Sequence, residues 1–493
     1  MMGMKLAQPM KRIALSLIVF ISCLVLVTWG AQHIELNYGT VSFSQYSALE
    51  ILVRLLTIPV LVATTFFYLA GCSTNGPTAP AAMHESAEAA VQPFRAQVVG
   101  VQWMNPLVRR DYPTEWQLLW TLSLASPNKG DYKIQTKPQK FTSVQPVASI
   151  VSNIFKDKTI EDFFFSYIDG IFRPFRNRYA SNPNYFYTVQ PKSQKLWREL
   201  AGIHVEIALP DRPDLNAEAA KEIVQKAIIS QFGIGGRPTI SSRSTPPDVR
   251  ITAGNANAGF TSLSAALDYL ESHPTESVWA MNWDAPEFPL DERMSENFTL
   301  LILAGPNFDT EREPLAWIGR PATRNAKDFE VQSGQPRLVQ AWRAAIDEAA
   351  YNAGRPLTDV GYLIHDAGMA SDAAGKRLAT LGQALGEPLP EFDILKQGFN
   401  NTALMGNTGA GTALTNVALA IAYAHHKGTP VLVAGTAEPD TAAAVVVTPP
   451  ARARVFDPSK DWFRARGERN AYLPWWGLRR DVDWSLYMQG FSE

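Results

Sequence analysis

Two stretches of this 493-residue sequence pass through the same succession of helix and strand patterns. The first stretch predicts, in order, a helix over 217–232, a strand over 248–252, a helix over 258–271 and strands over 277–282 and 298–304. The second predicts a helix over 338–351, a strand over 360–364, helices over 373–385 and 412–426, and paired strands over 430–434 and 443–448. Strands that alternate with helices in two related halves predict a layered α/β fold with helices packed on sheets.

The composition indicates a folded protein and excludes several kinds of partner and site. Hydrophobic residues make up 46% of the chain and charged residues 19%, which is enough apolar material for more than one core. Net charge is −2, and no run of Lys or Arg alternates with aromatic residues, so no nucleic-acid partner is expected. Because no cysteine follows Cys72, the later residues offer no thiol for catalysis, a disulfide or a zinc site. We expect neither a cofactor nor a metal.

The first 72 residues predict a membrane anchor of two transmembrane helices. Residues 13–32 contain no charged side chain, and residues 51–71 contain only Arg54, close to their start. Each stretch is long enough to cross a hydrocarbon core of roughly 30 Å. Three basic residues precede the first stretch, whereas the loop over 33–50 has no Lys or Arg. This bias places the N-terminus in the cytoplasm, and two crossings return the chain there.

Two other interpretations of this end are open. The first apolar stretch could be a cleaved signal peptide, although a second apolar stretch follows it. The sequence Leu69-Ala-Gly-Cys72 is similar to a bacterial lipoprotein processing site, and lipidation of Cys72 would make everything after it periplasmic. Residues 73–93 are rich in Ala, Pro, Ser and Thr without hydrophobic periodicity, which predicts a flexible tether.

Three short motifs lie at the starts of predicted helices or the ends of predicted strands. They are Asn257-Ala-Gly259-Phe-Thr-Ser-Leu263, Gly361-Tyr-Leu-Ile-His365-Asp-Ala-Gly-Met369 and Gly406-Asn407-Thr408 within a Gly-rich turn that ends at Gly411. The Gly-rich turn is not followed by Lys-Ser or Lys-Thr and lacks the spacing of a dinucleotide site, so it indicates close packing of a helix on a strand rather than a phosphate site.

These motifs and the two-pass order resemble the thiolase and ketoacyl-synthase fold over roughly residues 210–450. In that family a nucleophilic cysteine begins a helix in the first half, and Gly259 stands at this position. The second half supplies two histidines, which correspond to His365 and Asn407. The resemblance therefore implies a degenerate active site without catalytic residues, in which His365 is a hydrogen-bonded turn residue. A less favoured alternative is that Thr261 or Ser262 replaces the thiol with His365 as base.

The last 38 residues, 456–493, depart from this fold. They combine aromatic and basic residues, and the candidates for partner binding among them are Trp462, Trp475, Trp476, Arg479, Arg480 and Trp484. Trp and Arg dominate the energetics of many protein interfaces. The alternative is a C-terminal strap whose aromatic side chains pack back on the body.

Over nearly its whole length the chain resembles the type VI lipase adapter family of Gram-negative bacteria. With that resemblance we divide it into residues 1–72 as the anchor, 73–93 as the tether, 94–325 as an N-terminal soluble domain whose thiolase-like half starts at about residue 210, 326–455 as the second half, and 456–493 as the tail. The resemblance implies a non-enzymatic adaptor at the inner membrane, with a cytoplasmic body that binds a phospholipase effector and helps to load it on the type VI secretion spike.

Two functions of other classes stay open beside the adaptor. One is a membrane-anchored acyltransferase or hydrolase of the thiolase-like type, and the other is a periplasmic lipoprotein scaffold attached through Cys72. Thiolase-like folds often form dimers through the first half, so a homodimer is a further expectation of the resemblance.

Overall fold

One mixed β-sheet runs through the computed structural model, with its strands in the order β3-β2-β4-β5-β1-β6-β11-β10-β8-β9 and with β7 paired to β11. The strands are β1 (Arg95–Met104), β2 (His204–Pro210), β3 (Asp248–Gly254), β4 (Ser277–Asp284), β5 (Asn297–Ala304), β6 (Ala316–Gly319), β7 (Ala322–Asn325), β8 (Tyr362–His365), β9 (Gly398–Asn400), β10 (Val431–Gly435) and β11 (Thr441–Thr448). The structure describes residues 93–104, 200–236, 243–285, 297–309 and 313–451, together with a few single residues.

The strand arrangement of the first half recurs in the second. Strand β2 is parallel to both β3 and β4, and β4 is antiparallel to β5. In the same way β8 is parallel to both β9 and β10, and β10 is antiparallel to β11. A helix follows each of the first two parallel strands in either half, as crossover connections between parallel strands require. The α/β class expected from the sequence is therefore confirmed.

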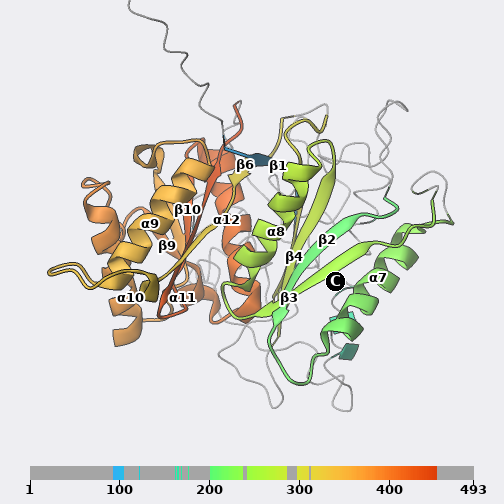
Figure 1. Ribbon diagram of the computed structural model, residues 1–493, viewed down its shortest axis with the longest axis horizontal. Coiled ribbons are helices and arrows are strands. Elements are labelled where there is room, and N and C mark those ends of the chain that lie inside the picture. Colours follow the sequence, from blue (N-terminus) through green and yellow to red (C-terminus); the bar gives the residue numbers. More distant parts are fainter. Residues whose placement is uncertain are drawn as a thin grey trace, which may run out of the picture. The chain divides into compact units, whose positions relative to one another are not determined.

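Two apolar helices lie between the sheet regions of the two halves. Helix α8 (Ala258–Ser272) contacts β2 and β4, whereas α12 (Thr412–Lys427) contacts β5, β10 and α8. Nearly every side chain of α12 is buried, because this helix is covered on all sides. Figure 1 shows α8 and α12 at the centre, with strands of the two halves on either side.

The remaining long helices cover the outer faces. Helix α7 (Ala217–Phe232) packs beside β3, while α9 (Arg337–Asn352) and α10 (Asp372–Gly386) form a second core with Leu363, Leu432 and Val446 (Figure 1). Helix α7 starts at the N-cap Asn216, whose side chain accepts hydrogen bonds from two backbone N–H groups. It ends at Gly233, which has a φ of 63° and a left-handed conformation that glycine adopts without strain.

Among the described residues, four strands and one α-helix were not expected from the sequence: β2, β6, β7, β9 and the short helix α11 (Asn401–Met405). The most important of them is β2, because it is paired on both sides and is the central parallel strand of the first half. Its alternation of polar and apolar residues is typical of a half-exposed strand, yet all seven of its residues are buried.

Several other predictions fall on residues that the structure does not describe. These are the transmembrane helices over 13–32 and 51–71, the tether, Cys72 and the tail after residue 451. Within the described part of the chain, none of the helices has both the length and the apolar character to cross a membrane.

Candidate functional site

The candidate site lies where the N-terminal ends of α8 and α12 meet the carboxyl ends of strands from the opposite half. Gly435, the last residue of β10, lies so close to Asn257, the N-cap of α8, that a Cβ on Gly435 would clash with Asn257 Oδ1. On the other side, Ala410 just before α12 donates its backbone N–H to Asp284 Oδ2 at the end of β4, at 2.7 Å. Each half thus holds the start of the other half's central helix.

Gly259, the position of the family nucleophile, is buried in the first turn of α8 against α12. A Cβ at this position would lie 2.9 Å from Ala413 Cβ, 3.2 Å from Leu414 Cγ and 3.3 Å from the Leu414 backbone nitrogen. These distances are shorter than ordinary van der Waals contacts, so a larger side chain requires α12 to shift. Gly259 therefore permits close packing of α8 on α12. It also offers no nucleophile.

Replacing Gly259 with cysteine is expected to give no acyl-enzyme and to destabilise the fold by about 1–3 kcal/mol through overpacking. Mass spectrometry after incubation with an acyl-CoA, together with urea denaturation, checks both effects. The matched control is Gly259→Cys combined with Ala413→Gly, which removes the contacting methyl group and should recover part of the stability. A stable acyl adduct at residue 259 in the single variant would contradict the prediction.

His365 ends β8 and is 3% exposed. Its Nδ1 accepts a hydrogen bond from the backbone N–H of Ala367 at 3.3 Å. Burial lowers the pKa of His365 to about 4, because desolvation disfavours the charged imidazolium. The ring is therefore neutral near pH 7. Its hydrogen bond from Ala367 stabilises the turn after β8.

Asn407 differs from His365 in exposure and has a different hydrogen-bond partner. Its side chain is exposed, and its Oδ1 accepts a hydrogen bond from the backbone N–H of Gly409 at 2.9 Å, which closes an Asx turn. Among the described residues no hydrogen bond joins His365 to Asn407. The structure thus shows His365 and Asn407 as two separate turn residues.

Asp366, which the sequence did not indicate as a site residue, is the most deeply buried carboxyl group of this region. Asp366 Oδ1 accepts hydrogen bonds from the backbone N–H of Thr436 at 2.5 Å and from its hydroxyl at 2.8 Å. Burial raises the pKa of Asp366 above its usual value, and the two bonds from Thr436 oppose this rise. Asp366 therefore ties the end of β8 to the end of β10. The only signal in the sequence was its place directly after His365.

A buried polar network fastens the start of α12 to the first half. Asn282 and Asn297 donate side-chain N–H groups to the backbone oxygen of Gly411, at 2.8 and 3.0 Å. The hydroxyl of Thr415 donates to the same oxygen at 2.7 Å and lies 3.0 Å from the hydroxyl of Thr299. Because buried polar groups are costly without partners, this network fixes one position of α12 against β4 and β5.

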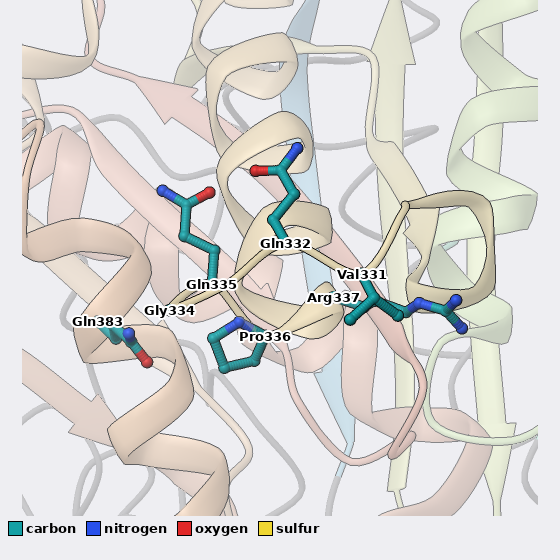
Figure 2. Close-up of a pocket in the computed structure, with 7 residues that line it drawn as sticks. All are labelled: Val331, Gln332, Gly334, Gln335, Pro336, Arg337 and Gln383. Atoms are coloured by element: carbon teal, nitrogen blue, oxygen red, sulfur yellow. The ribbon is translucent and has the colours of Figure 1, made fainter.

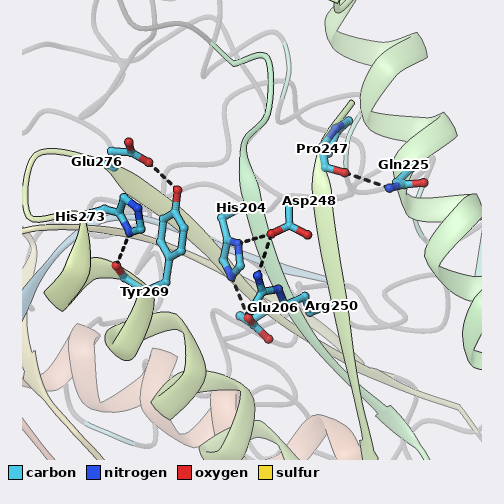
Figure 3. A network of polar contacts seen from close by, with 9 residues as sticks. All are labelled: His204, Glu206, Gln225, Pro247, Asp248, Arg250, Tyr269, His273 and Glu276. Atoms are coloured by element: carbon cyan, nitrogen blue, oxygen red, sulfur yellow. Dashed lines mark hydrogen bonds and ion pairs between the residues drawn. The ribbon is translucent and has the colours of Figure 1, made fainter. Parts of the chain in front are cut away.

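A second buried polar cluster lies at the start of β2 and β3 (Figure 3). His204 Nε2 is 2.7 Å from Glu206 Oε1, and His204 Nδ1 is 2.9 Å from Asp248 Oδ2. The ring of Tyr269 stacks on His204 with centroids 4.0 Å apart, and the Tyr269 hydroxyl donates to Glu276 at 2.5 Å. Both ring nitrogens of a buried histidine thus face carboxylates. In the described part of the chain, no three His, Cys, Asp or Glu side chains, these included, are placed so that they could hold a metal ion.

Solved structures similar to this chain include ketosynthases. A ketosynthase domain for oxazolomycin from Streptomyces albus is 13% identical, with a TM-score of 0.46, and the match covers 75% of this chain and 99% of that one. The β-ketoacyl-[acyl carrier protein] synthase III of Thermus thermophilus is 14% identical, with a TM-score of 0.40 and coverage of 73% and 100%. At this level of similarity neither structure bears on the chemistry of this chain.

A narrower family match lies in the second half. Residues 315–449, from β6 to β11, match the family described as "Type VI lipase adapter protein Tla3, C-terminal". The resemblance to type VI lipase adapters is thereby confirmed for this segment, which contains His365 and Asn407. No curated protein has a significantly similar sequence.

The other predicted site residues lie outside the described part of the chain. They are Cys72, Trp462, Trp475, Trp476, Arg479, Arg480 and Trp484. Their roles in lipidation and partner binding stay predictions.

Proposed function

We propose that this protein is a non-enzymatic adaptor that binds a phospholipase effector and helps to load it on the spike of a type VI secretion system. The match of residues 315–449 to the type VI lipase adapter family carries the proposal. We further propose that residues 13–32 and 51–71 anchor the protein in the bacterial inner membrane, with its body in the cytoplasm where an effector awaits export.

Three features of the candidate site support a binding role rather than acyl transfer. Gly259 offers no nucleophile and is packed against Ala413. His365 is neutral near pH 7, and its Nδ1 accepts a hydrogen bond from its own turn. The exposed Asn407 bonds to its own turn as well. Acyl transfer through a covalent intermediate needs an activated nucleophile within reach of a base. Gly259 supplies no nucleophile, and an imidazole whose pKa is lowered to about 4 is only a weak base.

The experiment is affinity capture by the tagged full chain, co-expressed in bacterial cells with a type VI phospholipase effector of the same genome. The effector is produced without any export signal, so capture also requires a cytoplasmic body. We expect stoichiometric capture of the effector and none of an unrelated phospholipase of similar size and charge. Acyl transfer from acyl-CoA by the full chain, without capture, would favour the membrane-anchored enzyme. Capture only of an exported effector, with lipid on Cys72, would favour the periplasmic scaffold.

A further inference from the structure

A surface hollow of about 410 Å³ lies at the start of α9, inside the segment that matches the adapter family. The residues that line it come from the loop before α9, from the first residue of that helix and from α10: Val331, Gln332, Gly334, Gln335, Pro336, Arg337 and Gln383. Figure 2 shows Gln383 on the neighbouring helix, beside the loop and the helix start that carry the others.

The charge of this hollow is one-sided. Arg337 is its only charged lining residue, and within the described part of the chain this guanidinium has no ion pair or hydrogen bond. The first turn of α9 contains no acidic residue. The hollow therefore presents an uncompensated positive charge together with three glutamine side chains, each of which can both donate and accept hydrogen bonds.

Its shape is fixed by hydrogen bonds that do not involve the lining side chains. The side chain of Gln340 on α9 donates to the backbone oxygens of Glu330 and Gln335, at 3.0 and 3.1 Å. The backbone N–H of Gln335 donates to Gln332 O at 3.2 Å, and Gly334 turns the chain with a φ of 79°. A loop held in this way loses little conformational freedom when a ligand binds.

An apolar surface adjoins the polar lining. Val331 is 79% exposed, and Pro336 lines the same hollow. A single exposed valine is ordinary on a protein surface. Here, however, the valine lies beside an unpaired arginine and three amide side chains. It adds an apolar contact to a site that can bind both a charged group and peptide groups.

We propose that this hollow binds an extended acidic segment of the effector. A carboxylate of the segment pairs with Arg337, its peptide groups bond to the glutamine side chains, and an apolar side chain next to the carboxylate packs on Val331 and Pro336. The positive and acid-free lining selects this partner over a basic or purely apolar one. This inference rests on the proposed adaptor function. It locates the surface that contacts the effector at the start of α9.

The test measures the affinity of the purified full chain for the same phospholipase effector by titration calorimetry. Arg337→Glu is expected to weaken binding by about tenfold or more, since it replaces a charge-assisted pair with repulsion. Lys376→Glu is the matched control: it makes the same change of charge at an exposed position of α10 that does not line the hollow, and we expect less than about a twofold effect. Both side chains are exposed, so neither change should lower the melting temperature.

The possible results separate this inference from the proposed function. If the wild-type chain binds the effector and Arg337→Glu binds equally well, the hollow is not the contact surface, while the adaptor function stands. Equal weakening by Arg337→Glu and Lys376→Glu would show a diffuse charge effect and would also overturn the inference. If the wild-type chain does not bind the effector at all, both proposals fall. Restoration of Arg337→Glu binding by changing an acidic effector residue to lysine would identify the opposing group.

Discussion

Replacing His204 with leucine is expected to lower the free energy of unfolding by about 3–5 kcal/mol. Glu206 is buried, with a side chain only 4% exposed. Its Oε1 lies 2.7 Å from His204 Nε2 and forms a hydrogen bond with it. Without the imidazole this carboxylate would stay in the core with no partner, which is among the most costly changes that one substitution can make. The shift of the urea midpoint of the full chain measures the loss.

The matched control is the double variant His204→Leu with Glu206→Leu, which removes both members of the buried pair. Apolar residues of similar volume often replace a buried polar pair at little cost, so the double variant should be more stable than the single one. Asp248 is half-exposed and also contacts Arg250 at 3.2 Å, so solvent and that arginine can accommodate it. Equal destabilisation in the two variants would show that the loss comes from ring packing on Tyr269 instead.

The same cluster explains why the sequence analysis missed the central strand of the first half. His204 and Glu206 interrupt the apolar pattern that predicts a buried strand, and their compensation by Asp248 comes from a segment 44 residues away. Where the pattern was uniform, it predicted well. The bounds of α7 were expected at 217–232 and are observed there, because both the amphipathic period and the terminal Gly233 are local signals.

The candidate site was predictable only in part, for a similar reason. The sequence located Gly259 and His365 by their turns, and both lie at the meeting of helix starts and strand ends. It did not indicate Asp366, Asn257 or the network around Gly411, whose partners lie about 70 to 180 residues away along the chain. Contacts of this kind depend on the packing of two halves, and no local spacing encodes them.

Contacts between the two halves fill the candidate site. The start of α12 is fastened by Asn282, Asp284 and Asn297 of the first half, and Asn257 at the start of α8 lies against Gly435 of the second. The interior of the candidate site is thus occupied by contacts between the two halves. A rigid body of this type leaves the outer surface, including the hollow at α9, as the part free to recognise a partner.

The stability of the wild-type protein should decrease by about 3 kcal/mol through His365 alone as the pH falls from 6.5 to about 4. The pKa of the folded protein, about 4, is lower than the unfolded value of 6.5, so the unfolded chain takes up a proton first. The contribution is therefore fully present above pH 6.5 and is lost as the pH approaches the folded value. Asp366, whose pKa is raised by burial, acts in the opposite sense as the pH falls.

His365→Asn isolates the histidine contribution, because asparagine can still accept the hydrogen bond from Ala367 but does not titrate in this range. Urea midpoints of both proteins across this pH range give the difference, in which Asp366 and the other shared groups largely cancel. We expect the wild type to lose more stability than the variant on acidification. Parallel profiles would mean that His365 keeps an ordinary pKa in the folded protein. A histidine that titrates near neutral pH could act as a general base, and the enzymatic alternative would then gain support.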